Sequence, residues 1–105
     1  MTKTISYHAQ YERQARIDYI IDKVRGDFGQ AICSSKESRN NCKRTLTDKG
    51  LIILTDVDTN RLVTMYFGNV GQIVQLYTSA KNVNKCPQWI MKLAHSVQQY
   101  NKEQP

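Results

Sequence analysis

Two apolar, β-branched runs separated by turn-forming residues constrain the fold of this chain most strongly. Residues 51–56 read LIILTD and residues 61–67 read RLVTMYF, and the residues between them are Val57, Asp58, Thr59 and Asn60. A second set of turn residues, Asp48-Lys49-Gly50, precedes the first run. Asp, Asn and Gly favour tight turns, and runs of this kind joined by short turns are typical of antiparallel strands. With two further strand-like pieces at residues 30–34 and 43–47, the sequence predicts a four-stranded antiparallel meander.

The segment before the meander has helical spacing. A short strand is predicted over residues 4–7, after which Ser6 caps a helix over residues 8–16. Asp18 offers a second N-cap, and apolar residues recur at helical intervals up to Gly26, which suits a helix end. We therefore expect two short N-terminal helices, the second over residues 19–25.

The segment after the meander predicts two more helices. Val70, Ile73, Val74 and Tyr77 mark one face of a helix, although a fifth strand is an alternative for this stretch. Pro87 suits the first position of a last helix, because its missing backbone donor has no partner there in any case. An apolar stripe follows and is expected to pack on the sheet, so its tryptophan is interpreted as core and not as a platform for bases; the stripe is Trp89, Ile90, Leu93, Ala94 and Val97.

These elements make the predicted fold α+β: two short N-terminal helices packed on an antiparallel four-stranded meander, with C-terminal helices. A length of 105 residues fits one domain over residues 1–105, because two halves would each be too small to bury a core. The start MTKTISYHAQ contains no apolar signal segment, which predicts a cytoplasmic protein with no membrane association. In that compartment the three cysteines are expected to be reduced, with a Cys33–Cys42 pair across a hairpin as the alternative.

Positive charge is concentrated in two parts of the chain. Fifteen Lys and Arg against nine Asp and Glu give a net charge of +6, and no acidic residue lies between Thr59 and Asn101. That stretch is the first of the two parts. The second is a basic cluster in a polar segment, in which Glu37 is the single acidic residue; its members are Lys36, Arg39, Lys43 and Arg44. Such fields attract polyanions, since contacts of Lys and Arg with phosphate provide most non-specific affinity for nucleic acid. Ordinary solubility is the alternative explanation of this charge.

One segment carries residues suited to chemistry. His8, Glu12 and Arg16 follow one another at i, i+4 and i+8, which places them along one side of a helix. A carboxylate beside a histidine orients the imidazole, and an arginine one turn further can hold a phosphate. Cleavage of RNA needs an acid, a base and fixed positive charge, and it needs no metal. An exposed helix with an ordinary i,i+4 pair is the alternative, and neither a metal site nor a cofactor is predicted.

The same segment resembles a known family. A His8-Ala9 start, Arg16 eight residues after the histidine, Ile17 directly after it and the hairpin GLIILTDVDTNRLVTMY look like small phage and bacterial proteins related to the RelE/barnase-like ribonuclease toxin superfamily. The pattern HAxxRxxxRGI of that group has an arginine where this chain has Glu12, while Arg13 stands one position later. The glycine of the pattern is absent, so Ile17 follows Arg16 directly. The likeness covers about residues 5–67, so residues 68–105 would form a C-terminal helical extension. It implies His8, Arg16 and Tyr66 as catalytic residues, with Thr64 facing the same cleft.

Three functions follow from charge and resemblance together. The first is a phage- or prophage-type protein that binds nucleic acid, RNA above all, or a host or antitoxin-like protein, without catalysis; its nucleic-acid-binding residues would be Arg13, Lys36, Arg39, Lys43 and Arg44. The second is a metal-independent ribonuclease that uses acid–base chemistry. The third is a structural or oligomer-forming protein, of which an apolar patch of Tyr7, Tyr11 and Tyr19 would be the sign.

Overall fold

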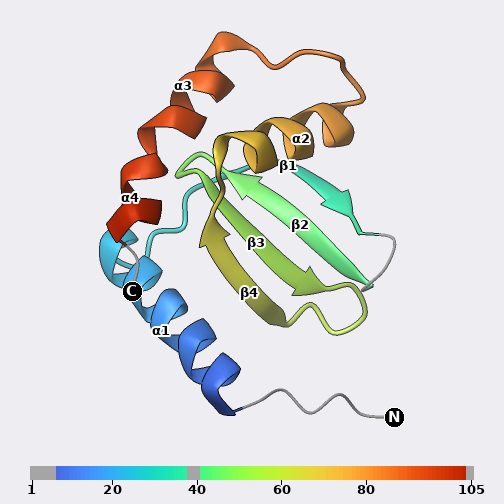
Figure 1. Ribbon diagram of the computed structural model, residues 1–105. Coiled ribbons are helices and arrows are strands. Elements are labelled where there is room, and N and C mark those ends of the chain that lie inside the picture. The colour runs from blue at the N-terminus through green and yellow to red at the C-terminus, as the bar shows by residue number, and fades with distance from the viewer. Residues whose placement is uncertain (1–6, 38–40, 104–105) are drawn as a thin grey trace.

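A four-stranded antiparallel sheet and four helices make up the protein (Figure 1). The computed structural model describes residues 7–37 and 41–103, with side chains from residue 12 onward. The elements in chain order are α1 (Tyr7–Val24), β1 (Ala31–Lys36), β2 (Cys42–Thr47), β3 (Leu51–Asp56), β4 (Leu62–Phe67), α2 (Val70–Lys81), α3 (Gln88–Ser96) and α4 (Gln98–Glu103). The predicted α+β class, with its antiparallel meander and C-terminal helices, is confirmed.

The sheet has the simple order β1-β2-β3-β4, and the turn residues explain it. Gly50 adopts a φ of 76° between β2 and β3, a conformation that glycine adopts without strain. Between β3 and β4, the Asp56 carboxylate accepts the backbone N–H groups of Asp58 and Thr59, both at 2.9 Å. These local bonds close the turns and bring each strand back beside the one before it.

The N-terminal part differs from its prediction. One continuous helix, α1, replaces the two short helices expected over residues 8–16 and 19–25. Asp18 was expected to cap the second helix, but its carboxylate instead accepts a hydrogen bond of 2.9 Å from the Gln14 side chain one turn earlier. An i,i+4 bond of this kind supports the helix through Asp18. The strand predicted over residues 4–7 and its Ser6 cap lie outside the described residues, except that Tyr7 begins α1.

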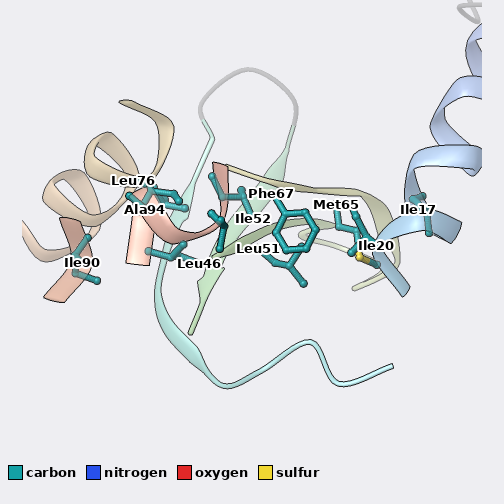
Figure 2. Packing of buried hydrophobic residues seen from close by; sticks show 12 residues of the cluster. Ile17, Ile20, Leu46, Leu51, Ile52, Met65, Phe67, Leu76, Ile90 and Ala94 are labelled. Carbon is teal, nitrogen blue, oxygen red and sulfur yellow. The ribbon is translucent and has the colours of Figure 1, made fainter. Parts of the chain in front are cut away.

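The hydrophobic core runs through the sheet from one set of helices to another. In Figure 2, Leu76, Ile90 and Ala94 of α2 and α3 lie at one end, the strand residues lie in the middle, and Ile17 and Ile20 of α1 lie at the other end beside Met65. α1 contacts β4, whereas α2 contacts β1 and β2. Helices α1 and α4 are also tied together, because the Tyr19 hydroxyl of α1 donates a hydrogen bond of 3.1 Å to the Glu103 carboxylate of α4.

Two predictions for the C-terminal half have different outcomes. The helix expected after residue 69 is present as α2, with Asn69 and Gln72 forming a reciprocal capping box. In α3, Ile90, Ala94 and Val97 at its end are buried as expected, but Trp89 is 52% exposed, so its assignment to the core is wrong. Trp89 lies about 100° around the helix from Ile90 and so misses the buried stripe.

The positions of the cysteines decide whether a disulfide bond forms. Cys33, Cys42 and Cys86 form no disulfide bond, so the alternative of a Cys33–Cys42 pair is wrong. The register separates those two residues, because Cys33 lies opposite Leu46 while Cys42 lies opposite Asp56.

Within residues 7–37 and 41–103, no helix has the length and apolar character needed to cross a membrane.

Candidate functional site: an arginine cluster on one face of the sheet

Strand register gathers several predicted site residues on one sheet face. Arg44 of β2 lies opposite Leu54 of β3, and Leu54 lies opposite Thr64 of β4. Residues directly opposite one another in neighbouring strands point to the same face, so Arg44 and Thr64 share it. Tyr66 is two residues beyond Thr64 on β4 and therefore points the same way.

Helix α1 adds a second guanidinium to this face. The Arg16 Nη2 atom donates a hydrogen bond of 2.9 Å to the Thr64 hydroxyl, across 48 positions of sequence. This bond is possible because α1 packs along β4, the edge strand of the sheet (Figure 1). It brings together two of the residues that the sequence marked, one from the helix and one from the strand.

Arg44 is paired with a carboxylate from the preceding strand end. Its Nε atom lies 3.4 Å from the Glu37 Oε1 atom, and the two side chains are 20% and 23% exposed. The hairpin explains the pairing, because Ser35 lies opposite Arg44 and Glu37 follows β1 directly. Glu37 was recognised in the sequence only as an interruption of a basic cluster, and no sequence pattern predicts this ion pair without the register.

The two guanidinium groups retain hydrogen-bonding capacity. The Nε atoms of Arg16 and Arg44 are buried and have no hydrogen-bond partner among the described residues. A guanidinium has five N–H donors in a planar fork that matches carboxylate and phosphate oxygens. The cluster therefore holds positive charge in a partly desolvated place, where it interacts with an oxyanion more strongly than in open water.

Tyr66 lies within the electrostatic field of these groups. Burial raises the pKa of the Tyr66 hydroxyl above its ordinary value; Glu37 adds to the rise, whereas Arg44 and Arg16 oppose it. The hydroxyl is thus protonated at neutral pH and is available as a hydrogen-bond donor. Arg16, Arg44, Tyr66, Thr64 and Glu37 are called the arginine cluster below.

The remaining predicted site residues divide into groups. Lys36 and Lys43 lie opposite one another across β1 and β2 and alternate with Ser35 and Arg44, so they point to the other face. Arg13 is half-buried on α1, one turn before Arg16. The structure therefore separates Lys36 and Lys43 from Arg44, although all three belong to one basic stretch of sequence.

Two predicted residues lie wholly or partly outside the description. The backbone of His8 lies in the first turn of α1, in the same helix as Glu12 and Arg16, but its side chain is outside the described residues. Arg39 lies outside them altogether. Among the described residues, no group of three or more His, Cys, Asp or Glu side chains is arranged to hold a metal ion.

An open pocket of about 470 Å³ lies elsewhere. Its lining includes the ends of α1 and β4 and part of α3 and α4, among them Lys23, Lys49, Phe67 and Tyr100. None of its lining residues belongs to the arginine cluster. The arginine cluster is therefore separate from this pocket.

Comparison with known proteins gives no relative: no family model, curated protein or solved structure matches this chain significantly.

Proposed function

We propose that this protein binds RNA through its phosphate backbone at the arginine cluster and does not cleave it. The observation that carries the proposal is the convergence of Arg16 and Arg44 beside the hydroxyls of Thr64 and Tyr66. Arginine forks bind phosphate in two-point geometry, and hydroxyl groups are common further donors to phosphate oxygens. The net charge of +6 adds a long-range attraction for any polyanion.

The Arg44–Glu37 ion pair supports an oxyanion as the ligand. A carboxylate already lies 3.4 Å from the Arg44 guanidinium, so the position accepts a negatively charged oxygen. Phosphate has the same type of oxygen with more charge to share between two guanidinium groups. The preference for RNA comes from the resemblance of residues 5–67 to small phage and bacterial proteins of the RelE/barnase-like type.

We propose binding without cleavage because neither Tyr66 nor Glu37 of the arginine cluster is suited to act as the catalytic base. Transfer of the 2′-hydroxyl proton needs a base, after which the 2′-oxygen attacks phosphorus and the 5′-oxygen leaves with a proton from an acid. The raised pKa of Tyr66 prevents it from acting as a base near neutral pH. The Glu37 carboxylate is held by Arg44. Neither group is therefore arranged as the base.

Binding can be tested by fluorescence anisotropy with a labelled single-stranded RNA. Arg16→Gln and Arg44→Gln should each weaken binding by about tenfold, since a hydrogen bond to a charged group contributes about 1.5 kcal/mol or more. Each should also reduce the slope of log affinity against log salt by about one phosphate contact. Arg61→Gln, at an exposed position beside β4, is the matched control and should have a smaller effect. No measurable affinity at low salt would overturn the proposal.

A metal-independent ribonuclease is the second candidate, and the position of Tyr66 favours it. A protonated hydroxyl near two guanidinium groups has the properties of a general acid beside phosphate-binding residues. The base would be His8, in the helix that also carries Arg16. Incubation with mixed RNA in EDTA decides between the two: cleavage by wild type that His8→Ala and Tyr66→Phe both lose would establish the enzyme.

A protein ligand is a third outcome of the same experiments. Acidic side chains of a host or antitoxin-like partner would meet the same guanidinium groups. Such a partner would compete with RNA for the wild type and lose affinity in Arg16→Gln and Arg44→Gln alike. Binding of such a partner that Arg16→Gln and Arg44→Gln both weaken, in the absence of measurable RNA affinity, would replace RNA by protein as the ligand.

A further inference from the structure

Trp89 is unusually exposed for a residue of its type. It is the single tryptophan of the chain, and 52% of its surface is in contact with solvent. Tryptophan is the side chain with the largest apolar area to bury. Its exposure therefore indicates a binding role more strongly than the exposure of a smaller apolar residue does. The neighbouring Ile90 is fully buried, so α3 is firmly packed while Trp89 remains outside the core.

A second aromatic ring orients Trp89. The Tyr77 ring of α2 meets it edge to face, with ring centroids 6.5 Å apart and an interplanar angle of 83°. Contacts between α2 and α3 hold the two helices together. The aromatic pair of Tyr77 and Trp89 thus joins two helices that pack together, which fixes the direction of the tryptophan ring without burying it.

Exposed lysines accompany this aromatic pair on both helices. Lys81 follows Tyr77 by four residues on α2, and Lys92 follows Trp89 by three residues on α3, so each lysine lies on the same side of its helix as the ring. Lys85 is exposed in the connection between the helices. No acidic residue occurs from Thr59 to Asn101, so the surface formed by this segment has no negative side chain of its own.

We propose that Trp89, braced by Tyr77 and flanked by Lys81 and Lys92, is a stacking platform for an unpaired base of single-stranded nucleic acid. This combination of an aromatic face with nearby positive charge is the usual means of holding single strands without sequence preference. The inference rests on the proposed function, because it assumes that the chain binds nucleic acid. It adds a second contact point and specifies a single strand, since the faces of paired bases are stacked inside a duplex.

The charge around Trp89 favours nucleic acid over an apolar protein partner. Other exposed large apolar residues lie mainly in other elements: Ile21 is in α1, Leu62 begins β4 and Val57 lies between β3 and β4. Val83, in the connection before α3, is the exception. Exposed lysines on the same sides of α2 and α3 thus accompany Trp89, whereas the core of a protein interface is depleted in charge.

The single tryptophan makes this site directly observable. A 12-nucleotide oligouridylate should quench Trp89 fluorescence in a saturable way, and an RNA duplex of the same length should quench it far less. In anisotropy measurements, Trp89→Ala should weaken oligouridylate binding by about 5- to 150-fold, the range for loss of one stacked base. Trp89→Phe retains a ring and should recover much of the affinity.

Matched controls separate stacking from charge and from misfolding. Lys92→Gln should weaken binding more than Lys102→Gln, which removes an exposed lysine of α4 away from the aromatic pair. Because Trp89 is exposed, both Trp89 variants should unfold at nearly the wild-type urea concentration. If Trp89→Ala loses binding while Trp89→Phe retains it, the loss is due to the missing ring and not to misfolding.

The possible results distinguish this inference from the proposed function. RNA binding with unchanged tryptophan emission and full affinity in Trp89→Ala would overturn the platform and leave the arginine cluster standing. No binding of oligouridylate by either method at low salt would overturn both. A change in emission on raising protein concentration without RNA, with a dimer in size-exclusion chromatography, would assign Trp89 to self-association and overturn the platform.

Discussion

Two rows of residues on one face of the sheet have opposite characters. In the first row, Leu46 lies opposite Ile52, and both are fully buried. In the second row, two residues away along each strand, Arg44 lies opposite Leu54 and Leu54 lies opposite Thr64, and all three remain partly exposed. The same strands thus supply core in one row and charge in the next.

The difference between the rows follows from where α2 lies. Ile73 of α2 meets Ile52 near Gly68, and α2 contacts β1 and β2 (Figure 1). At the second row, the Arg16 guanidinium of α1 reaches Thr64 and donates a hydrogen bond to its hydroxyl. An antiparallel sheet commonly carries a core on one part and a polar surface on another, and here the boundary falls within a single face.

The substitution that should lower the free energy of unfolding most lies in the buried row. Ile52→Ala should lower the free energy of unfolding by about 2–5 kcal/mol, because it removes a fully buried side chain and leaves a cavity. Leu54→Ala, in the neighbouring row, should cost clearly less because Leu54 is half-buried. Urea denaturation followed by circular dichroism measures both. Equal losses would show that the two rows are not distinct.

A smaller effect is expected where α2 meets the sheet. A Cβ atom on Gly68 would lie 2.7 Å from both the Ile52 Cδ1 and the Ile73 Cγ1 atoms. Gly68→Ala should therefore cost about 1–3 kcal/mol by overpacking, measured by the same urea denaturation. Gly71→Ala is the control, since a Cβ atom there would lie 3.5 Å from the Asn69 side chain, an ordinary van der Waals distance. A neutral Gly68→Ala would contradict the close packing of α2 on the first row.

Removal of the carboxylate that pairs with Arg44 should strengthen RNA binding. Glu37→Gln removes the negative charge next to Arg44, which competes with phosphate for that guanidinium. The expected gain is about two- to fivefold, in keeping with up to about 1 kcal/mol for a partly exposed ion pair. Asp22→Asn makes the same change of charge at an exposed position of α1 and should give a smaller gain. Weaker binding by Glu37→Gln would count against the cluster as the phosphate site.

The smallest effect concerns pH and Tyr66. Because the pKa of Tyr66 is raised in the folded protein, mainly by burial, the unfolded chain loses its proton first as the pH rises. The stabilisation is complete below about pH 10 and is lost as the pH rises through the folded pKa. Wild type should therefore lose stability above about pH 10 more steeply than Tyr66→Phe in urea denaturation. Parallel curves for the two proteins would place Tyr66 in an ordinary solvated environment.

The sequence predicted the strands more accurately than the helices, for local reasons. The strand expected over residues 51–56 is β3 itself, because Gly50 and the Asp56 turn mark its two ends. Asp18 misled the N-terminal prediction, since an aspartate suits a helix cap and also an i,i+4 bond inside a helix. Only the structure shows which of the two Asp18 makes.

The composition of the site was partly predictable and its arrangement was not. Charge and resemblance pointed to Arg16, Arg44 and Tyr66, which the structure brings together. The pairing of Glu37 with Arg44 and the separation of Lys43 from Arg44 depend on strand register. A shift of one residue exchanges the two faces of a strand, so a list of basic residues does not define a surface.

Nuclear magnetic resonance of the arginine side chains can detect phosphate contact at the arginine cluster itself. The Arg16 Nε–Hε group is buried and without a hydrogen-bond partner among the described residues, and that of Arg44 is buried and faces the Glu37 carboxylate at 3.4 Å, so both signals can report the arrival of a phosphate at the guanidinium groups. On titration with a single-stranded RNA, these two signals should shift together and saturate with the binding curve, while those of exposed Arg25 and Arg61 should move much less. A complex that forms while the Arg16 and Arg44 signals stay in place would contradict the account.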